Sequence, residues 1–208
     1  MATKIEPTNN HMHSCNGETV VLREFTGSLS DSSLTKAEII LIVNFYLFHA
    51  PVISNSLGTQ DKFGHMRLRD YGWADARHMN QLERLLLAGS SIPSFIMLKS
   101  ESIKGTLSSM LLDDIVCIEH PRAVMKINSD VKISEANEVK VSTKETRMEC
   151  LFRHIRNSLA HNCIYVFANG NILLEDSDEK ENLSARILIQ PKSLIDWIEI
   201  IKKDGTEK

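Results

Sequence analysis

Apolar residues recur at helical spacing in the first half of the chain. Thr35 and Glu38 have the spacing of a capping box, in which the hydroxyl and the carboxylate each accept a hydrogen bond from a free backbone N–H at the start of a helix. The helix that begins there is expected to run to about Pro51. A second helix, ending near Gly89, is predicted from one apolar stripe formed by Ala76, Met79, Leu82, Leu85 and Leu86.

A third helical segment is predicted after the second helix. Pro93 suits its first turn, Gly105 interrupts it, and the apolar pattern resumes from 107 to 118. Residues 122–141 are rich in Lys, Glu, Asn and Ser, which is typical of a long solvated connection. This connection is expected to carry a short strand at Val139–Val141.

Ser142 and Glu145 form a second capping-box pattern, so the next helix is predicted to begin at Thr143. At about 100° per residue, one arc of this helix about 100° wide is apolar and should face the core. Its members are Met148, Leu151, Phe152, Ile155 and Leu159. The opposite arc is expected to point away from the core and contains Cys150, Arg153, His154, Arg156, Asn157, Ala160 and His161.

After His161 the apolar pattern changes from helical to alternating, as in a β-strand. Residues 163–168 and 171–175 flank Asn169-Gly170, and both turn residues tolerate the positive φ angles of a type I′ turn. These two segments are therefore predicted to form a β-hairpin.

Residues 175–181 are acidic and predict a loop, after which Ala185–Gln190 should form a third strand. A last helix, Ser193–Lys203, is expected to bury Leu194, Trp197, Ile198 and Ile201. The predicted fold is mainly α: a helical bundle of roughly four to five helices with a small C-terminal three-stranded β-meander. Residues 1–33, rich in Thr, Asn, Ser and Gly, are expected to form a flexible N-terminal tail, and residues 34–205 a single domain.

The composition is that of an ordinary soluble globular protein, since 42% of the residues are hydrophobic and 25% are charged. The formal net charge is -3, so the chain as a whole has no basic field that would attract nucleic acid. An RNA site must therefore be a local patch. Basic residues outnumber acidic ones within 120–165, where they are Arg122, Lys126, Lys132, Lys140, Lys144, Arg147, Arg153 and Arg156.

Residues 37–53 are apolar enough to raise the question of a membrane span. Asn44, His49 and Pro51 interrupt the run before the roughly 20 residues that a span needs. A buried core helix is the favoured interpretation, and no membrane contact is expected. The four cysteines show no tight paired spacing, and the N-terminus lacks the pattern of a secretory signal peptide, so we expect a cytoplasmic protein.

The predicted helix that ends near His161 contains the strongest indication of chemistry. Arg156 is followed directly by the polar Asn157, and His161 ends the string Arg-His-Ile-Arg-Asn-Ser-Leu-Ala-His. This arrangement, late in a bundle helix, resembles the HEPN family, the all-helical domain of many prokaryotic toxin and antiviral ribonucleases. Residues 1–141 offer no diagnostic motif.

Arg156 and His161 do not converge well within one chain, because they lie about 140° apart around an ideal helix. A bend near His161 would bring them together. So would a second copy of the helix packed across a two-fold axis, and the small Ala160 would permit that close approach. The resemblance implies the second arrangement, since HEPN ribonucleases are dimers with a composite cleft between the two motif helices. A homodimer is therefore expected.

Metal-independent cleavage of RNA needs a base for the 2′-hydroxyl and an acid for the leaving 5′-oxygen, and a pair of imidazoles supplies both near neutral pH. His161 would take this role. Arg156 would offset the extra negative charge on the phosphorus, and Asn157 would orient the phosphate or the histidine by hydrogen bonding. The wider RNA- and phosphate-binding surface is predicted to include Arg153, His154, Arg147 and Lys144.

The expected function is a metal-independent endoribonuclease that cleaves RNA by transphosphorylation from the 2′-hydroxyl, acting as a toxin or an antiviral effector. No cofactor and no metal are expected, RNA is the expected partner, and an antitoxin protein is a further candidate partner. The alternative is a non-catalytic HEPN-like dimeric module that binds RNA or a protein. Catalysis needs both histidines near one phosphate, whereas binding needs only the basic patch.

Plainer interpretations of the same residues stay open. Arg156 can be an ordinary surface arginine, and His161 can be a last-turn residue that the helix macrodipole favours. Pairs of Cys and His invite a zinc hypothesis, although their spacings form no recognised paired knuckle: Cys117/His120, Cys150/His154 and His161/Cys163. The chain has no Gly-rich phosphate loop, Gly-x-Ser-x-Gly elbow or His-Glu-x-x-His motif, so nucleotide hydrolases, esterases and metalloproteases lack support.

Overall fold

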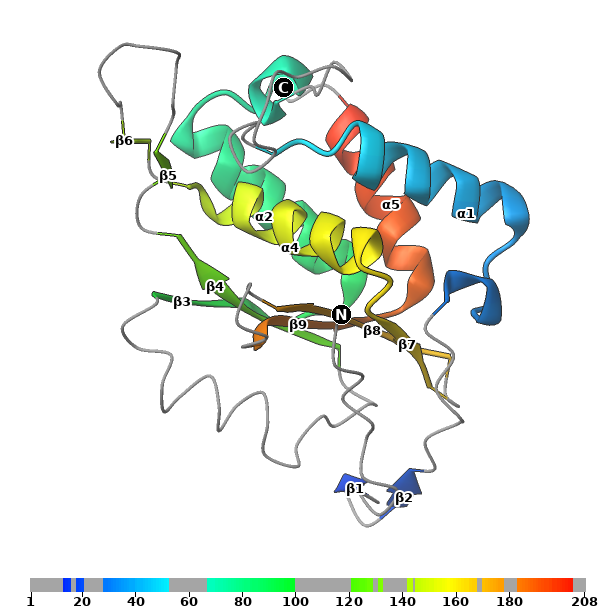
Figure 1. Cartoon of the computed structure of the whole chain (residues 1–208). Coiled ribbons are helices and arrows are strands. Elements are labelled where there is room, and N and C mark those ends of the chain that lie inside the picture. Colours follow the sequence, from blue (N-terminus) through cyan, green and yellow to red (C-terminus); the bar gives the residue numbers. More distant parts are fainter. Residues whose placement is uncertain are drawn as a thin grey trace.

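The computed structural model describes residues 13–15, 18–20, 28–52, 67–99, 121–128, 131–132, 142–143, 145–167, 170–177 and 183–203. Its central feature is a five-stranded mixed sheet in the order β3-β4-β9-β8-β7 (Figure 1). The strands are β3 (Phe95–Lys99), β4 (Arg122–Ile127), β7 (Ile164–Val166), β8 (Ile172–Ser177) and β9 (Leu183–Ile189). β3 pairs with β4 in parallel, and the other neighbouring pairs in this sheet are antiparallel.

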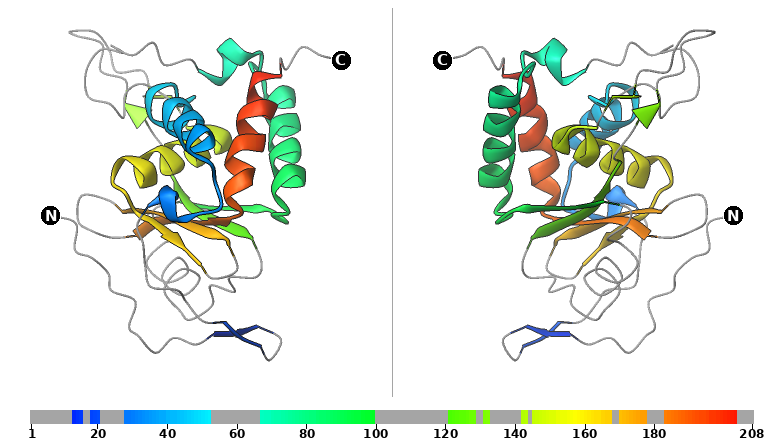
Figure 2. Two further views of the ribbon diagram at one scale, coloured as in Figure 1. Left: turned by 90° about the vertical axis from the view of Figure 1, so that its right-hand side faces the viewer. Right: turned by 90° about the vertical axis from the view of Figure 1, so that its left-hand side faces the viewer.

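The longer helices cover one face of this sheet and are α1 (Lys36–Val43), α2 (Ala76–Ser90), α4 (Arg147–Ala160) and α5 (Pro191–Lys202). Figures 1 and 2 show them on the same side, with α2 running alongside α5. The short elements are η1 (Leu29–Asp31), η2 (Asn44–Phe48), η4 (Leu68–Tyr71) and the paired strands β1 (His13–Cys15) with β2 (Glu18–Val20) and β5 (Val131–Lys132) with β6 (Ser142–Thr143). Within the described segments, no helix combines the length and the apolar character that crossing a membrane requires.

The fold is α/β, so the predicted mainly α helical bundle with a three-stranded meander is wrong. Strands β3 and β4 are not predicted from the sequence. Pro93 precedes strand β3 rather than opening a third helix, and β4 occupies the start of the predicted solvated connection. The segment 107–118 and the short strand predicted at Val139–Val141 lie outside the described residues.

Strand β4 has no recognisable strand pattern because it lies inside the sheet. Ala123, Val124 and Met125 are buried in succession, so β4 lacks the alternation of a half-exposed strand. Charged residues, Arg122 and Lys126, stand on either side of this apolar run. The strands that pair with β4 are β3 and β9, both distant in the sequence. The contacts that stabilise β4 are therefore not local.

Elements with strong local signals form as predicted. Thr35 and Glu38 make the capping box of α1, and the helical path continues through the π-helical turn η2 to Phe48. The β7-β8 hairpin is antiparallel, with Val166 opposite Ile172. Helix α5 buries its predicted set, Leu194, Trp197, Ile198 and Ile201.

Helix α4 begins later than predicted. Thr146 and Glu149 form its capping box in place of Ser142 and Glu145, so the first helical residue is Arg147. Both pairs have the same Ser/Thr-x-x-Glu spacing, and local sequence does not decide between them. The Glu145 carboxylate is instead used in tertiary contacts with the end of β4 and with α4.

Two further boundaries differ from the prediction. Helix α2 continues past Gly89 to Ser90 and ends where Ser91 takes a left-handed φ of 57°. Strand β8 runs on past Glu175, where the predicted strand ended, into the segment predicted as an acidic loop, so Asp176 is a strand residue; both Glu175 and Asp176 are buried. A carboxylate in a strand is therefore available to the helix layer.

The main hydrophobic core lies between the helices and the sheet, with α4 at its centre. Helix α4 contacts β4 and β8 on its sheet side and η2 on its other side. On the η2 side, the ring centroids of Phe152 and Tyr46 are 6.3 Å apart. The predicted division into a tail at 1–33 and a single domain at 34–205 stays a prediction.

Candidate functional site

Helix α4, which carries the motif residues, is buried on two faces. Its predicted apolar arc is buried as expected: Met148, Leu151, Phe152, Ile155 and Leu159. The opposite arc is only partly open to solvent, because Cys150 and His154 are both 0% exposed. These residues are buried because this arc of α4 packs against the sheet and forms hydrogen bonds to β4 and β8. The motif helix therefore has a polar interior face as well as an exposed end.

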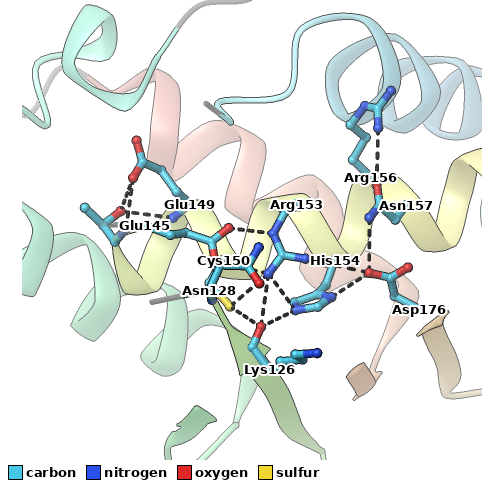
Figure 3. Close-up of polar contacts among 11 residues, drawn as sticks. Lys126, Asn128, Glu145, Glu149, Cys150, Arg153, His154, Arg156, Asn157 and Asp176 are labelled. Carbon is cyan, nitrogen blue, oxygen red and sulfur yellow. Dashed lines mark hydrogen bonds and ion pairs between the residues drawn. The ribbon is translucent and has the colours of Figure 1, made fainter. Parts of the chain in front are cut away.

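His154 is a buried link between two strands (Figure 3). Its Nδ1 lies 2.6 Å from Oδ2 of Asp176 on β8, and its Nε2 lies 2.8 Å from the carbonyl oxygen of Lys126 on β4. The Nη2 of Arg153 lies 3.1 Å from the same Nε2. Both ring nitrogens thus have partners inside the protein. The predicted contribution of His154 to a phosphate-binding surface is not supported by this placement.

Arg153 is held inside the molecule by Glu145. The Nε atom of Arg153 lies 2.5 Å from Oε1 of Glu145, and its Nη2 donates to the Lys126 carbonyl at 3.0 Å. Burial by itself lowers the pKa of Arg153, but the hydrogen bond and the charge of Glu145 outweigh it and raise the pKa above its ordinary value. Glu145 therefore neutralises the positive charge of Arg153. The Arg153 side chain joins α4 to β4 through the Lys126 carbonyl.

Asp176 connects this buried group to the motif. Its Oδ2 accepts a hydrogen bond from Nδ2 of Asn157 at 3.1 Å, in addition to its contact with His154. The Oδ1 of Asn157 in turn accepts from Nη1 of Arg156 at 3.1 Å. Figure 3 shows the resulting chain of contacts from β8 through Asn157 to Arg156, which lies on the side of α4 away from the sheet. The motif arginine is therefore fixed through a neutral amide.

Arg156 is a motif residue with unused hydrogen-bonding capacity. It is partly buried, and its Nε is buried without a hydrogen-bond partner among the described residues. Burial lowers the pKa of Arg156, and the charge of Asp176 opposes this shift in part. No carboxylate in the described part of the chain forms an ion pair with it, whereas ion pairs hold Arg67, Arg147, Arg153 and Arg186. Because a guanidinium stays charged at neutral pH, Arg156 carries an unneutralised positive charge.

His161 occupies the C-terminal end of α4, where it is exposed. Its backbone N–H donates to the carbonyl of Asn157 at 2.9 Å, and Asn162 then takes a left-handed φ of 55°. No hydrogen bond to its ring is formed by the described residues. Ala160 is exposed beside it. The end of the helix thus presents an imidazole and a small residue to solvent.

Arg147, a further residue of the predicted RNA-binding surface, is bound to Glu83 on α2 and to Phe95 on β3. Arg147 makes two hydrogen bonds from Nε and one from Nη2 to the Glu83 carboxylate, and its Nη2 also donates to the Phe95 carbonyl. Its side chain is 46% exposed, so it combines a structural ion pair with partial access to solvent. The side chain of Lys144 lies outside the described residues.

Asp176 and Glu145 are the site residues that the sequence analysis missed. Asp176 had been placed in an acidic loop, although the apolar residues Ile172 and Leu174 set an alternation that assigns it to the helix-facing side of β8. That alternation was the available signal. For Glu145, which occupied a plausible capping position, the sequence carries no comparable signal.

Cys150, one of the cysteines of the zinc hypothesis, has a different role. Cys150 and His154 do lie together, but the Cys150 thiol donates to the Lys126 carbonyl at 3.3 Å, and burial raises its pKa to about 12. Such a thiol stays protonated, whereas a zinc ligand is a thiolate. Within the described segments, no three His, Cys, Asp or Glu residues form a group that could hold a metal ion. Cys117 and His120 lie outside those segments.

A comparison against protein families finds a match to the part of the chain that contains the motif helix. The family model HEPN pEK499 p136 matches residues 67–205, which is more than half of the chain and includes all of α4. Neither a curated protein nor a solved structure matches the chain. The resemblance inferred from the Arg156–His161 string is confirmed, and the chain belongs to the HEPN pEK499 p136 family.

Proposed function

We propose that the protein is a metal-independent endoribonuclease that cleaves RNA by attack of a 2′-hydroxyl on the adjacent phosphate. The observation that carries this proposal is the state of Arg156. Carboxylates pair directly with Arg147 and Arg153, whereas Arg156 is held by an amide, forms no ion pair among the described residues and has an Nε without a hydrogen-bond partner there. A permanently charged planar fork with free N–H groups is suited to a phosphate.

The proposed chemistry divides between two side chains. His161 moves protons, because imidazole both accepts and donates a proton near neutral pH. Arg156 stabilises the negative charge that develops on the pentacoordinate phosphorus. Asn157 orients the Arg156 guanidinium through their 3.1 Å hydrogen bond, whereas the sequence predicted that it would orient the phosphate or the histidine. The protein would act as a toxin or an antiviral effector, which an antitoxin protein would have to restrain.

A dimer completes this site. Arg156 and His161 lie about 140° apart around the helix, so one chain does not direct both at the same phosphate. Across a two-fold axis, exposed Ala160 allows two copies of α4 to approach closely. The full-length protein is therefore expected to be a dimer at micromolar concentration in analytical ultracentrifugation. A single monomeric species at high concentration would contradict the composite site.

Cleavage is expected to survive EDTA and to leave 2′,3′-cyclic phosphate ends, because the attacking nucleophile is the 2′-hydroxyl rather than a metal-bound water. An RNA in which every 2′-hydroxyl is methylated is the matched control and should stay intact. Mass spectrometry of the products is the measurement. Products with 5′-phosphate ends, or activity abolished by the chelator, would contradict the proposed mechanism.

The alternative is a non-catalytic dimeric module that binds RNA or a protein partner. One observation favours it: within the described part of the chain, no group hydrogen-bonds to the ring of His161, so nothing there orients the imidazole. General acid–base catalysis needs a positioned ring. Binding of RNA by the wild-type dimer, without cleavage at high enzyme concentration, would select this alternative.

A further inference from the structure

Asp176 lies outside the motif, yet its carboxylate accepts a hydrogen bond from the motif residue Asn157. Its side chain is 3% exposed, and its Oδ2 contacts both His154 and Asn157. Nothing in the Arg156–His161 string requires such a residue on β8. The contacts suggest a task beyond packing, because one of the two hydrogen bonds leads directly to Arg156.

A carboxylate oxygen only accepts hydrogen bonds, and this determines which way the Asn157 amide points. The Nδ2 of Asn157 must face Asp176, so its Oδ1 must face the other way, toward Arg156. An amide turned by 180° would direct N–H groups at the guanidinium, where donor would meet donor. Asp176 thereby orients the Asn157 amide so that its Oδ1 accepts a hydrogen bond from Arg156.

The neutral amide has a second consequence. A direct ion pair between Arg156 and a carboxylate would position the guanidinium as well, but RNA would then have to displace the carboxylate. The relay through Asn157 holds Arg156 without neutralising it. The carboxylates of Glu145 and Glu83, by contrast, contact their arginines directly.

Resting on the proposed function, we infer that Asp176 is a positioning residue, which acts through the Asn157 amide to orient Arg156 toward an RNA phosphate. It does not touch the RNA. Its contact with His154 fixes the carboxylate against β4 and α4, so that the direction of the Asn157 amide is set by the sheet.

The test uses Asp176→Asn, which changes one oxygen into an amide of nearly equal size. The new side chain can donate, so the Asn157 amide is free to turn. We expect affinity for a 2′-O-methyl RNA oligonucleotide, measured by fluorescence anisotropy, to fall about fivefold, the effect of one misplaced hydrogen bond. Charge alone predicts the opposite result, because removing a carboxylate strengthens the attraction for phosphates. The direction of the change therefore separates positioning from electrostatics.

Glu175→Gln is the matched control. Glu175 is the neighbour of Asp176 on β8 and is also buried, but it belongs to the opposite face of the sheet, where its carboxylate is paired with Arg186 of β9. The Glu175→Gln substitution removes one negative charge from β8, as Asp176→Asn does. We expect both variants to lower the melting temperature and only Asp176→Asn to weaken RNA binding. Equal weakening by both would overturn the inference.

A double-mutant cycle with Arg156→Ala completes the experiment. Without the guanidinium, Asp176→Asn should change RNA affinity by less than about twofold, because its effect passes through Arg156. An undiminished fivefold loss in that background would overturn the positioning role and leave the phosphate contact of Arg156 standing. If Arg156→Ala alone leaves affinity unchanged, the phosphate contact itself fails and the positioning role fails with it.

Asn157→Ala keeps the experiment decisive if Asp176→Asn does not fold. It removes the same relay from its other end and leaves the contact between His154 and Asp176 in place. It should reproduce the fivefold loss and the dependence on Arg156. Affinity equal to that of the wild type would overturn the inference.

Discussion

His161→Ala is expected to lower RNA cleavage on the order of a hundredfold or more, the usual scale for loss of a general acid–base group, and to leave RNA affinity nearly unchanged. The side chain is exposed at the end of α4, so its loss leaves no cavity. The backbone hydrogen bonds that end the helix also remain, including those from His161 to Asn157 and from Cys163 to Ser158. The measurement is single-turnover cleavage of a labelled RNA, with affinity determined in parallel.

His78→Ala is the control for loss of a histidine. His78 lies on α2, where its Nδ1 is 3.1 Å from the Asp75 carboxylate, and it is not part of the motif helix. Its replacement should leave cleavage within about twofold of the wild type, as for a surface change remote from the site. Full activity of His161→Ala would show that this histidine is not the proton carrier.

The sequence predicted those elements whose signals are local. The capping box at Thr35 and the hairpin predicted from Asn169-Gly170 each depend on a few adjacent residues, and both the helix α1 and the antiparallel pair β7-β8 form. The prediction of the apolar arc of the motif helix was also correct, because the 3.6-residue period of apolar positions can be seen within a single helix. The motif string consists of adjacent residues and can be read without any tertiary contact. The family could therefore be inferred from the sequence although the fold could not.

The mainly α prediction failed where stability comes from distant partners. Strand β4 pairs with β3 and β9, and its buried centre, Ala123 to Met125, looks like any short apolar run. The buried polar network was not predicted for the same reason, since its residues are also brought together by tertiary contacts. That Asp176 on β8 binds His154 on α4 follows only from the register of the sheet beneath the helix. Polar residues that appear to face solvent on a helical wheel can therefore face a sheet.

The predicted surface of basic residues illustrates this point for function. Arg153 and Arg156 look equivalent in the sequence, since both lie on the non-apolar part of the motif helix. In the structure Arg153 is 13% exposed and paired with Glu145, while Arg156 has no carboxylate partner among the described residues. Only tertiary contacts separate a structural arginine from one available to a phosphate.

Arg156→Ala is expected to damage binding and cleavage together, because the guanidinium is proposed to hold the phosphate and to stabilise its transition state. RNA affinity should fall about tenfold, as for the loss of a charge-assisted contact. Cleavage at saturating RNA should fall by a further factor of about a hundred, the scale for loss of an electrostatic donor. Arg156→Lys retains the charge but lacks the planar fork, so it should restore much of the affinity and little of the cleavage rate.

Arg84→Ala is the matched control for this pair of variants. Arg84 is exposed on α2 and is not part of the motif helix, so its removal subtracts one positive charge and leaves the hydrogen bonds of Arg156 in place. A small loss of affinity at low salt, with an unchanged cleavage rate, is the expected result, since it measures the general attraction of RNA for positive charge. Two outcomes would contradict the role of Arg156: an Arg156→Ala protein no worse than Arg84→Ala, or an Arg156→Lys protein with the full cleavage rate. The second would show that charge alone, without the directed donors, is sufficient at this position.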